Sequence, residues 1–246
     1  MTRLPRAVLL DLDDTILDDS GHSRRCWSEA CLRHAADLEG IDPSVLHEAI
    51  ERVRTWYWSD AERHRIGRLN LLAAYAEVVA MACEEVGLGR SSAAADIAAH
   101  YHAERNAAIA PFPDAVETVR WLRERGCRLA LLTNGADAPQ RSKIERFGLA
   151  PLFDLILIEG ELGFGKPDPR VYRRALADLD VAPGEAWMVG DNPEWDVAAP
   201  QREGIFGVWV DRWERGLAEG HPVRPDRIIR RLVELRGAGA EATAGA

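Results

Sequence analysis

The chain has 246 residues, a formal net charge of −9 and a hydrophobic content of 47%. This length and apolar content suffice for one large α/β domain, or for a domain that carries an insert. The acidic balance excludes the basic surface with which proteins bind nucleic acid or an anionic membrane, so neither partner is expected.

The four cysteines form neither a CxxC pair nor a metal-binding spacing; they are Cys26, Cys31, Cys83 and Cys127. Reduced, buried thiols are therefore expected. The chain runs directly into a strand rather than a signal peptide, and no apolar run approaches the ~18 residues of a membrane span. We expect a soluble cytoplasmic protein, either a monomer or a homodimer.

The first half of the chain reads as one short strand followed by helices. The strand is predicted at 7–10. Apolar residues that recur with a period near 3.6 predict helices at 22–38, from 43 to about 56, at 69–86 and at 92–108. Asp42 and Pro43 have the residue types of a helix N-cap and a first helical residue. The Pro-Phe-Pro segment at 111–113 ends this helical pattern.

Helices and strands alternate in the second half. The predicted pairs are helix 115–125 with strand 128–132, helix 140–147 with strand 155–158, helix 169–179 with strand 186–189, and helix 193–202 with strand 207–210. This alternation predicts a parallel sheet. We therefore expect an α/β fold whose doubly wound, Rossmann-like core is formed by 1–17 and 111–236. A cap domain of four helices at 18–110 and a disordered, Gly/Ala-rich tail at 237–246 complete the prediction.

Four short polar blocks follow apolar runs in the predicted core. They are Asp11 to Thr15, Leu132 to Gly135, Gly165 to Pro167, and Gly190 to Asn192 with Asp196 close behind. In an open parallel sheet, ligands bind at the carboxyl ends of the strands. The blocks are therefore expected to converge on one crevice with several carboxylates, a hydroxyl and an ammonium.

Lysine is rare in this chain, because only Lys143 and Lys166 are lysines among 31 basic residues. A sequence that uses arginine almost everywhere is expected to need a compact ammonium at Lys166, since the planar fork of arginine has a different geometry. The position of Lys166 between two glycine-proline turn signals argues against an accidental surface residue.

The side chains of these blocks suit the hydrolysis of a phosphate ester. Asp11 and Asp13 lie two residues apart and thus on the same side of the strand end. Asp11 can attack phosphorus and form an aspartyl-phosphate, whereas Asp13 can protonate the leaving oxygen and then deprotonate water. Mg²⁺ prefers oxygen ligands, which Asp11, Asp191 and the Asp13 carbonyl can supply.

The second and third blocks can bind the phosphoryl group. The Thr133 hydroxyl, the Asn134 amide and nearby backbone N–H groups such as that of Gly135 can hold its oxygens. Lys166 can neutralise the charge of Asp11 and of the phosphoryl group. The substrate is expected to be a small phosphorylated metabolite, such as a sugar phosphate or a nucleotide-like compound.

The four blocks resemble the motifs of the haloacid dehalogenase-like hydrolase superfamily, in the branch with a helical cap between the first two motifs. The resemblance covers about 6–235. It implies a phosphatase in which Asp11 is the nucleophile, Asp13 the acid/base, and Thr133 and Lys166 the second and third motif residues. It also places Asp191 and Asp196 in the metal-binding fourth motif. Within that branch, segments 18–24, 132–135 and 140–145 are similar to N-acylneuraminate-9-phosphatases and related nucleotidases.

Two residues depart from the family pattern. Asp14 stands where many relatives have glycine, and Pro200 is expected to shorten or kink the helix that carries Asp196. Asp13 argues against dehalogenation, because a carbon–halogen bond needs no protonated leaving group. The alternatives to a phosphatase are a phosphomutase on the same scaffold and, as a different class, a non-catalytic binding module.

The predicted cap is rich in arginine and aromatic residues over a short stretch: Arg54, Trp56, Trp58, Arg63, His64, Arg65 and Arg68. Most of them are expected to pack the cap or to solvate its surface. Arg68 is the candidate for a substrate-binding residue, because its fork suits a carboxylate or second phosphate at the far end of the substrate.

Overall fold

The computed structural model describes residues 4–89 and 93–239 and divides the chain into two compact units. The core unit comprises Met1–Asp18 and Ala110–Ala246, and the helical unit comprises Asp19–Ile109. The helical unit is therefore a single insert, which the chain enters after β1 and leaves before the rest of the sheet is built.

A six-stranded sheet runs through the core unit in the order β5-β4-β1-β6-β7-β8. Its strands are β1 (Ala7–Leu10), β4 (Arg128–Thr133), β5 (Leu155–Ile158), β6 (Ala186–Gly190), β7 (Phe206–Val210) and β8 (Arg227–Ile229). All neighbouring strands are parallel, which confirms the predicted α/β class. Because β4 and β6 flank β1 on opposite sides, the strand order reverses at β1, where α/β proteins bind ligands.

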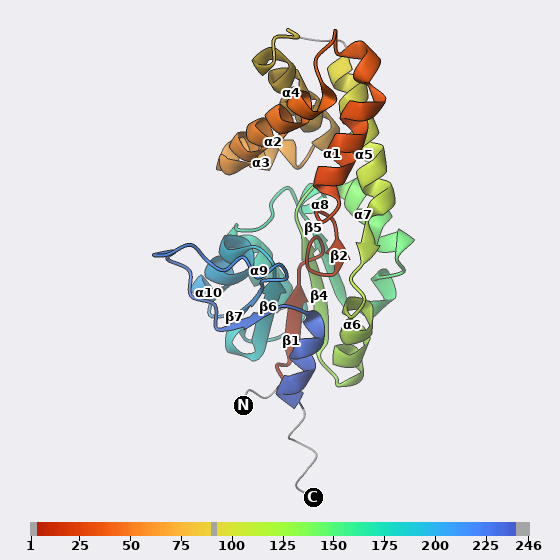
Figure 1. Cartoon of the computed structure of the whole chain (residues 1–246). Helices are drawn as coiled ribbons and strands as arrows, with labels where there is room; N and C mark the ends of the chain where they lie inside the picture. The colour runs from red at the N-terminus through yellow and green to blue at the C-terminus, as the bar shows by residue number, and fades with distance from the viewer. Residues whose placement is uncertain (1–3, 90–92, 240–246) are drawn as a thin grey trace, which may run out of the picture. The chain divides into compact units, whose positions relative to one another are not determined.

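Helices cover both faces of this sheet (Figure 1). They are α6 (Ala115–Glu124), α7 (Asp137–Arg146), α8 (Glu159–Leu162), α9 (Pro169–Asp178) and α10 (Ala199–Arg202). Val171 of α9 and Ala199 of α10 share a buried cluster with Leu9 and Met188 of the sheet. All of β1 is buried, as expected for a strand that reads as a continuous apolar run.

Short elements complete the core unit. The turns η2 (Ala150–Leu152) and η3 (Pro183–Glu185) precede β5 and β6, η4 (Pro193–Ala198) follows β6, and η5 (Leu232–Gly239) lies near the C-terminus. The tail predicted to be disordered therefore begins inside η5 at Gly237, and residues 240–246 lie outside the described residues. The sequence also missed β8, which is short and lies at the edge of the sheet.

A two-stranded antiparallel ribbon joins the two ends of the insert. Its strands are β2 (Leu17–Asp18) and β3 (Ala110–Pro111), and the sequence predicted neither. Arg212 braces this ribbon, because its guanidinium stacks 3.4 Å from the centre of the Phe112 ring and donates to the Thr15 carbonyl at 3.2 Å.

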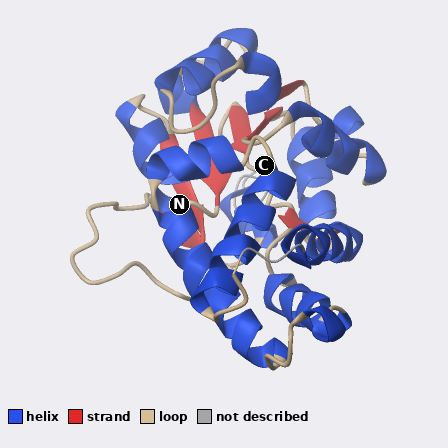
Figure 2. Cartoon of the chain, turned by 90° about the horizontal axis from the view of Figure 1, so that it is seen from above, coloured by secondary structure: helices blue, strands red, loops and turns tan. Residues whose placement is uncertain are grey.

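The regular elements of the described part of the helical unit are helices. Figure 2 shows the helices of the chain in blue and its strands in red. They are α1 (Ser23–Arg33), η1 (Ala35–Asp37), α2 (Pro43–Ser59), α3 (Ala61–Gly67), α4 (Leu71–Glu85) and α5 (Ala93–Ala108). The first predicted helix is too long, because α1 ends at Arg33 and a 3₁₀ turn follows. The predicted number of four is also wrong, because Asp60 ends α2 in an extended conformation and caps the additional helix α3 through the Arg63 N–H.

The helical unit has its own core. Cys26, Trp27, Leu46 and Val78 are buried there, and the Trp27 and Tyr101 rings stack with their centres 3.5 Å apart. Asp19 and Arg105 form an ion pair whose side chains are both about nine-tenths buried. This core is what allows an insert of this length to be compact by itself.

Candidate active site

Three polar segments meet at the carboxyl ends of neighbouring strands. Asp11 follows β1, Thr133 ends β4 and Asp191 follows β6, and these strands are adjacent in the sheet. The Asp11 N–H donates to the Val189 carbonyl at 3.0 Å, so the end of β1 stays in register with β6. The sheet thus brings these segments together at one edge, as the order of the strands requires.

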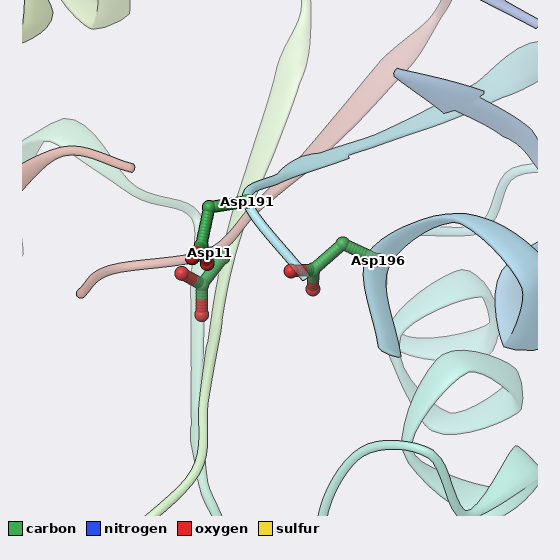
Figure 3. A group of neighbouring side chains, drawn as sticks. All are labelled: Asp11, Asp191 and Asp196. Atoms are coloured by element: carbon green, nitrogen blue, oxygen red, sulfur yellow. The ribbon is translucent and has the colours of Figure 1, made fainter. Parts of the chain in front are cut away.

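Asp11, Asp191 and Asp196 form an acidic cluster (Figure 3), in which one carboxylate oxygen of each lies within 4.8 Å of the others. Asp11 and Asp196 are buried. Burial raises the pKa of Asp11 to about 6, although the nearby Lys166 charge lowers it. Burial and the Asp11 charge also raise the pKa of Asp191 well above its usual range. Three carboxylates held so close to one another form a donor set that suits a hard divalent cation.

Lys166 is the cation that the protein itself supplies to this cluster. Its ammonium donates to Asp11 Oδ1 and to Asp196 Oδ1, each at 2.7 Å, and its side chain is only 2% exposed. Burial alone lowers the pKa of Lys166, but the charges of Asp11 and Asp196 outweigh it and raise the pKa above that of a free lysine. Lys166 is therefore charged at neutral pH. The second oxygen of Asp11 accepts from the Thr15 hydroxyl at 3.0 Å.

The position of Asp196 depends on the turn η4. Asp196 Oδ2 accepts from the Asn192 N–H at 3.0 Å, and the Asp196 N–H donates to the Asn192 carbonyl at 2.8 Å. A Cβ on Gly190 would lie 2.2 Å from the Asp196 Cγ, so only glycine fits there. The helical segment that carries Asp196 covers the predicted residues, because the π-helical η4 continues directly into α10, which contains Pro200 and ends at Arg202.

Asp13 lies outside the acidic cluster and has its own partners. Its Oδ1 accepts from Lys143 Nζ at 2.8 Å and its Oδ2 from Gln140 Nε2 at 2.9 Å. Asp14 explains how the chain turns here, because its φ of 58° lies in the left-handed region that glycine, asparagine and aspartate favour. The aspartate that replaces the glycine of many relatives is thus compatible with the turn.

Gln140 and Lys143 contact Asp13 although neither was predicted as a site residue. Both lie in α7, three residues apart, and therefore on the same face of that helix. One signal was available, since Lys143 is the other lysine of this arginine-rich chain. To predict its contact with Asp13, one would need to know how α7 is oriented relative to β1, and no local sequence pattern gives that orientation.

The second block is held tightly by neighbouring segments. The Gln140 amide also donates to the Thr133 hydroxyl, which is buried. Asn134 does not present its amide to the crevice as expected: Nδ2 donates to the Lys166 carbonyl at 2.6 Å and Oδ1 accepts from the Lys166 N–H at 2.8 Å. The Gly135 N–H likewise donates to Glu159 at 2.9 Å. In this structure, Asn134 and Gly135 fix the loops that carry Thr133 and Lys166.

The cap arginines have partners within the helical unit. Arg54 pairs with Glu51 at 3.0 Å, and Arg65 pairs with Glu62 at 2.7 Å. Arg63 stacks 3.8 Å over the Trp56 ring. Arg68 follows α3, is partly exposed and approaches His64 Nδ1 to 3.5 Å. These contacts agree with structural roles for the first three arginines and leave the role of Arg68 to be tested.

An open pocket of about 300 Å³ adjoins Asp191 in the core unit. It is lined by Trp209 of β7 and by Arg212, Trp213 and other residues of the loop that follows this strand. Among the residues that the structure describes, no helix combines the length and the apolar composition that a membrane crossing requires.

Comparison with known proteins places this geometry in context. A family model described as haloacid dehalogenase-like hydrolase matches residues 5–204. The chain is 40% identical to a phosphoserine phosphatase of Thermus thermophilus, across 94% of this chain and 97% of that protein. It is 27% identical to the N-acylneuraminate-9-phosphatase of Mus musculus, across 94% and 92% of the two chains. The structure of a Bacillus subtilis HAD-hydrolase bound to magnesium has the same fold, with a TM-score of 0.71 at 19% identity over 96% of this chain and 98% of that one.

Proposed function

Because this chain belongs to the haloacid dehalogenase-like hydrolases, we propose that it hydrolyses a small phosphate monoester through an aspartyl-phosphate on Asp11. The observation that supports this best is the setting of Asp11. Its carboxylate is buried next to two further carboxylates and is held by the Lys166 ammonium at 2.7 Å. Asp13 lies two residues on, outside that cluster, where it is able to exchange protons.

The two aspartates divide the chemistry between them. An Asp11 oxygen forms a bond to phosphorus while the ester P–O bond breaks, and the leaving oxygen takes a proton from Asp13. Asp13 then removes a proton from a water molecule, whose oxygen attacks the same phosphorus and releases phosphate and the Asp11 carboxylate. Lys166 keeps Asp11 oriented and lowers the repulsion between its carboxylate and the phosphoryl oxygens.

A divalent cation, most suitably Mg²⁺, fits the acidic cluster. Asp11, Asp191 and Asp196, with the carbonyl of Asp13, would hold it, because all of these donors are oxygens and the carboxylates repel one another without it. When bound, the ion reduces the repulsion between the nucleophile and the phosphoryl group.

Phosphoserine is the first substrate to test, because the 40% identical relative that bears its name aligns over almost the whole length of both chains. N-acylneuraminate 9-phosphate is the second. The experiment measures phosphate release from both compounds and from 4-nitrophenyl phosphate, in Mg²⁺ and in EDTA. We expect release only in Mg²⁺, and none from the Asp11→Asn variant. Full activity in EDTA would contradict the metal assignment, and release by Asp11→Asn would contradict the nucleophile.

We also propose that the protein works in the cytoplasm, as a monomer or a homodimer. The four cysteines are buried and none of them forms a disulfide, as is usual in proteins of a reducing compartment. Burial raises the pKa of Cys31 to about 12, so its thiol stays protonated and unreactive.

A further inference from the structure

The second lysine of the chain contacts the second aspartate of the first block. Lys143 Nζ lies 2.8 Å from Asp13 Oδ1, and the lysine side chain is only 12% exposed. The aspartate side chain is 29% exposed, so the contact lies at the edge of the buried site rather than on the open surface. Only two of the chain's 31 basic residues are lysines, and each one contacts an aspartate that the proposed reaction uses.

Gln140 donates a hydrogen bond to the other oxygen of the same carboxylate. Its Nε2 donates to Asp13 Oδ2 at 2.9 Å and also to the Thr133 hydroxyl. Gln140 is buried and lies one helical turn before Lys143 in α7. Each oxygen of Asp13 thus accepts a hydrogen bond from a separate side chain of one helix, which fixes the plane of the carboxylate.

The type of cation matters for a group that must exchange protons. A carboxylate oxygen has two lone pairs, so a donor that takes only one of them leaves acceptor capacity on that oxygen. An arginine fork binds carboxylates in a bidentate way and, together with Gln140, would occupy more of that capacity. The other cations of α7 are arginines with different contacts: Arg141 pairs with Glu161, and Arg146 stacks over Phe147.

We propose that Lys143 is a positioning residue for the proton transfers of Asp13: its ammonium, together with the Gln140 amide, holds the carboxylate in the orientation that reaches the leaving oxygen and the attacking water. This inference rests on the proposed function, because it assigns a role within that reaction. Correct placement of a catalytic group contributes a large part of the rate enhancement. Loss of the contact between Lys143 and Asp13 is therefore expected to slow turnover without weakening substrate binding.

The test compares Lys143→Met and Lys143→Arg with wild type on two substrates. Phosphoserine has an alkoxide leaving group that needs a proton, whereas 4-nitrophenolate leaves without one. For Lys143→Met on phosphoserine, we expect kcat to fall by about 10- to 100-fold, part of the usual contribution of acid–base catalysis, with KM within about twofold of wild type. Lys143→Arg is expected to lie between Lys143→Met and wild type.

Pre-steady-state kinetics with 4-nitrophenyl phosphate separate the two chemical steps. In Lys143→Met, we expect a rapid burst of nitrophenolate of about one equivalent per active site, followed by slow turnover, because only the second step still needs Asp13. The burst amplitude also counts the folded active sites. A burst reduced in proportion to kcat would show that the variant is misfolded and would overturn the positioning role.

A double-mutant cycle with Asp13→Asn shows whether Lys143 acts through Asp13. We expect Lys143→Met to change the activity of the Asp13→Asn protein by no more than about twofold, because the carboxylate that it positions is already gone. An equal loss in both backgrounds would overturn the inference and indicate direct contact with the substrate, as would a rise in KM with an unchanged kcat.

Arg141→Met is the matched control, because Arg141 is an ion-paired cation of the same helix whose partner, Glu161, lies outside the site. Its kcat is expected to stay near that of wild type. If wild type is active and Lys143→Met is indistinguishable from it, the inference fails while the proposed function stands. If wild type hydrolyses no phosphate ester at all, the proposed function fails and this inference with it.

Discussion

At the scale of single residues, the site is assembled at a cost in stability. The Asp11 carboxyl has a pKa of about 6, raised from the ordinary value of 3.8, mainly by burial. In the absence of a metal ion, the charged form of this group therefore weakens the folded state at neutral pH. The burial that prepares Asp11 as a nucleophile thus also lowers the stability of the folded state. Such a trade-off between activity and stability is common in enzymes.

Asp11→Asn is therefore expected to be inactive and yet more stable than wild type in EDTA at pH 7.5. The rise in the Asp11 pKa from 3.8 to about 6 corresponds to an upper limit of about 3 kcal/mol in the free energy of unfolding. At pH 4.5 the wild-type carboxyl is already protonated, so the difference should largely vanish. Urea unfolding at both pH values measures it, and a variant less stable than wild type at pH 7.5 would show that the lost contact with Lys166 dominates.

At the scale of elements, the junction of β6 and η4 places Asp196 through a close backbone approach. Gly190→Ala is expected to displace Asp196 from Lys166, since the added Cβ would lie 2.2 Å from the Asp196 Cγ. Overpacking of this kind costs about 1–3 kcal/mol. Phosphatase activity is expected to fall by more than the loss of folded protein explains, which thermal melting and kcat measured on the same samples will show.

Gly184→Ala is the control for this experiment, because nothing lies within 4 Å of the position that its Cβ would take. It should leave both the melting temperature and kcat close to those of wild type. A Gly190→Ala protein as active as this control would mean that the Asp196 carboxylate is free to move without consequence.

The elements that could be predicted from the sequence are those with a local signal. β1, β4 and β6 are apolar runs that end in polar blocks, and a parallel sheet requires the ends of such strands to meet. The ribbon of β2 and β3 had no such signal, since its two-residue strands exist only because Leu17 pairs with Pro111, far away in the chain. The end of α1 at Arg33 had no such signal either, because the apolar residues Ala35 and Leu38 continue the helical period past it.

The site shows the same division between local and distant information. Lys166 and Asp191 follow turn signals and strand ends, and they could be found in the sequence. The contact of Lys143 with Asp13 joins residues that are 130 positions apart, and it depends on the face that α7 turns to β1. The actual role of the Asn134 amide, which holds the Lys166 backbone, was equally hidden because the two loops meet only in the folded core unit.

At the scale of the whole molecule, stability should depend on pH and metal together. The folded state binds protons on Asp11 and Asp191 more tightly than the unfolded chain does, so in EDTA stability should fall as pH rises from about 4 through about 6. Mg²⁺ must displace those protons. The rise in melting temperature that Mg²⁺ causes is therefore expected to be larger at pH 7.5 than at pH 5, and a rise independent of pH would contradict a site at this cluster.

Recognition of one particular substrate is expected to need groups other than those that bind its phosphoryl group. Asp11, Lys166 and the acidic cluster interact with features that every phosphate ester shares, so discrimination must come from other groups. Arg68→Ala is expected to lower kcat/KM for the preferred substrate more than for 4-nitrophenyl phosphate. Arg65→Ala serves as its control, because Arg65 pairs with Glu62 on the surface. Equal changes for both substrates would remove Arg68 from the recognition of the substrate.

The ribbon of β2 and β3 makes the insert a replaceable module. Paired strands lie about 4.8 Å apart, so the chain leaves the core unit and re-enters it at almost the same point. A two-residue hairpin turn such as Asn-Gly is enough to close that gap. The segment between Asp18 and Ala110 can therefore be replaced by segments of other lengths without a change in the register of the six-stranded sheet. The acidic cluster lies wholly in the core unit, so an exchange of this kind leaves its three carboxylates on the same strands and loops.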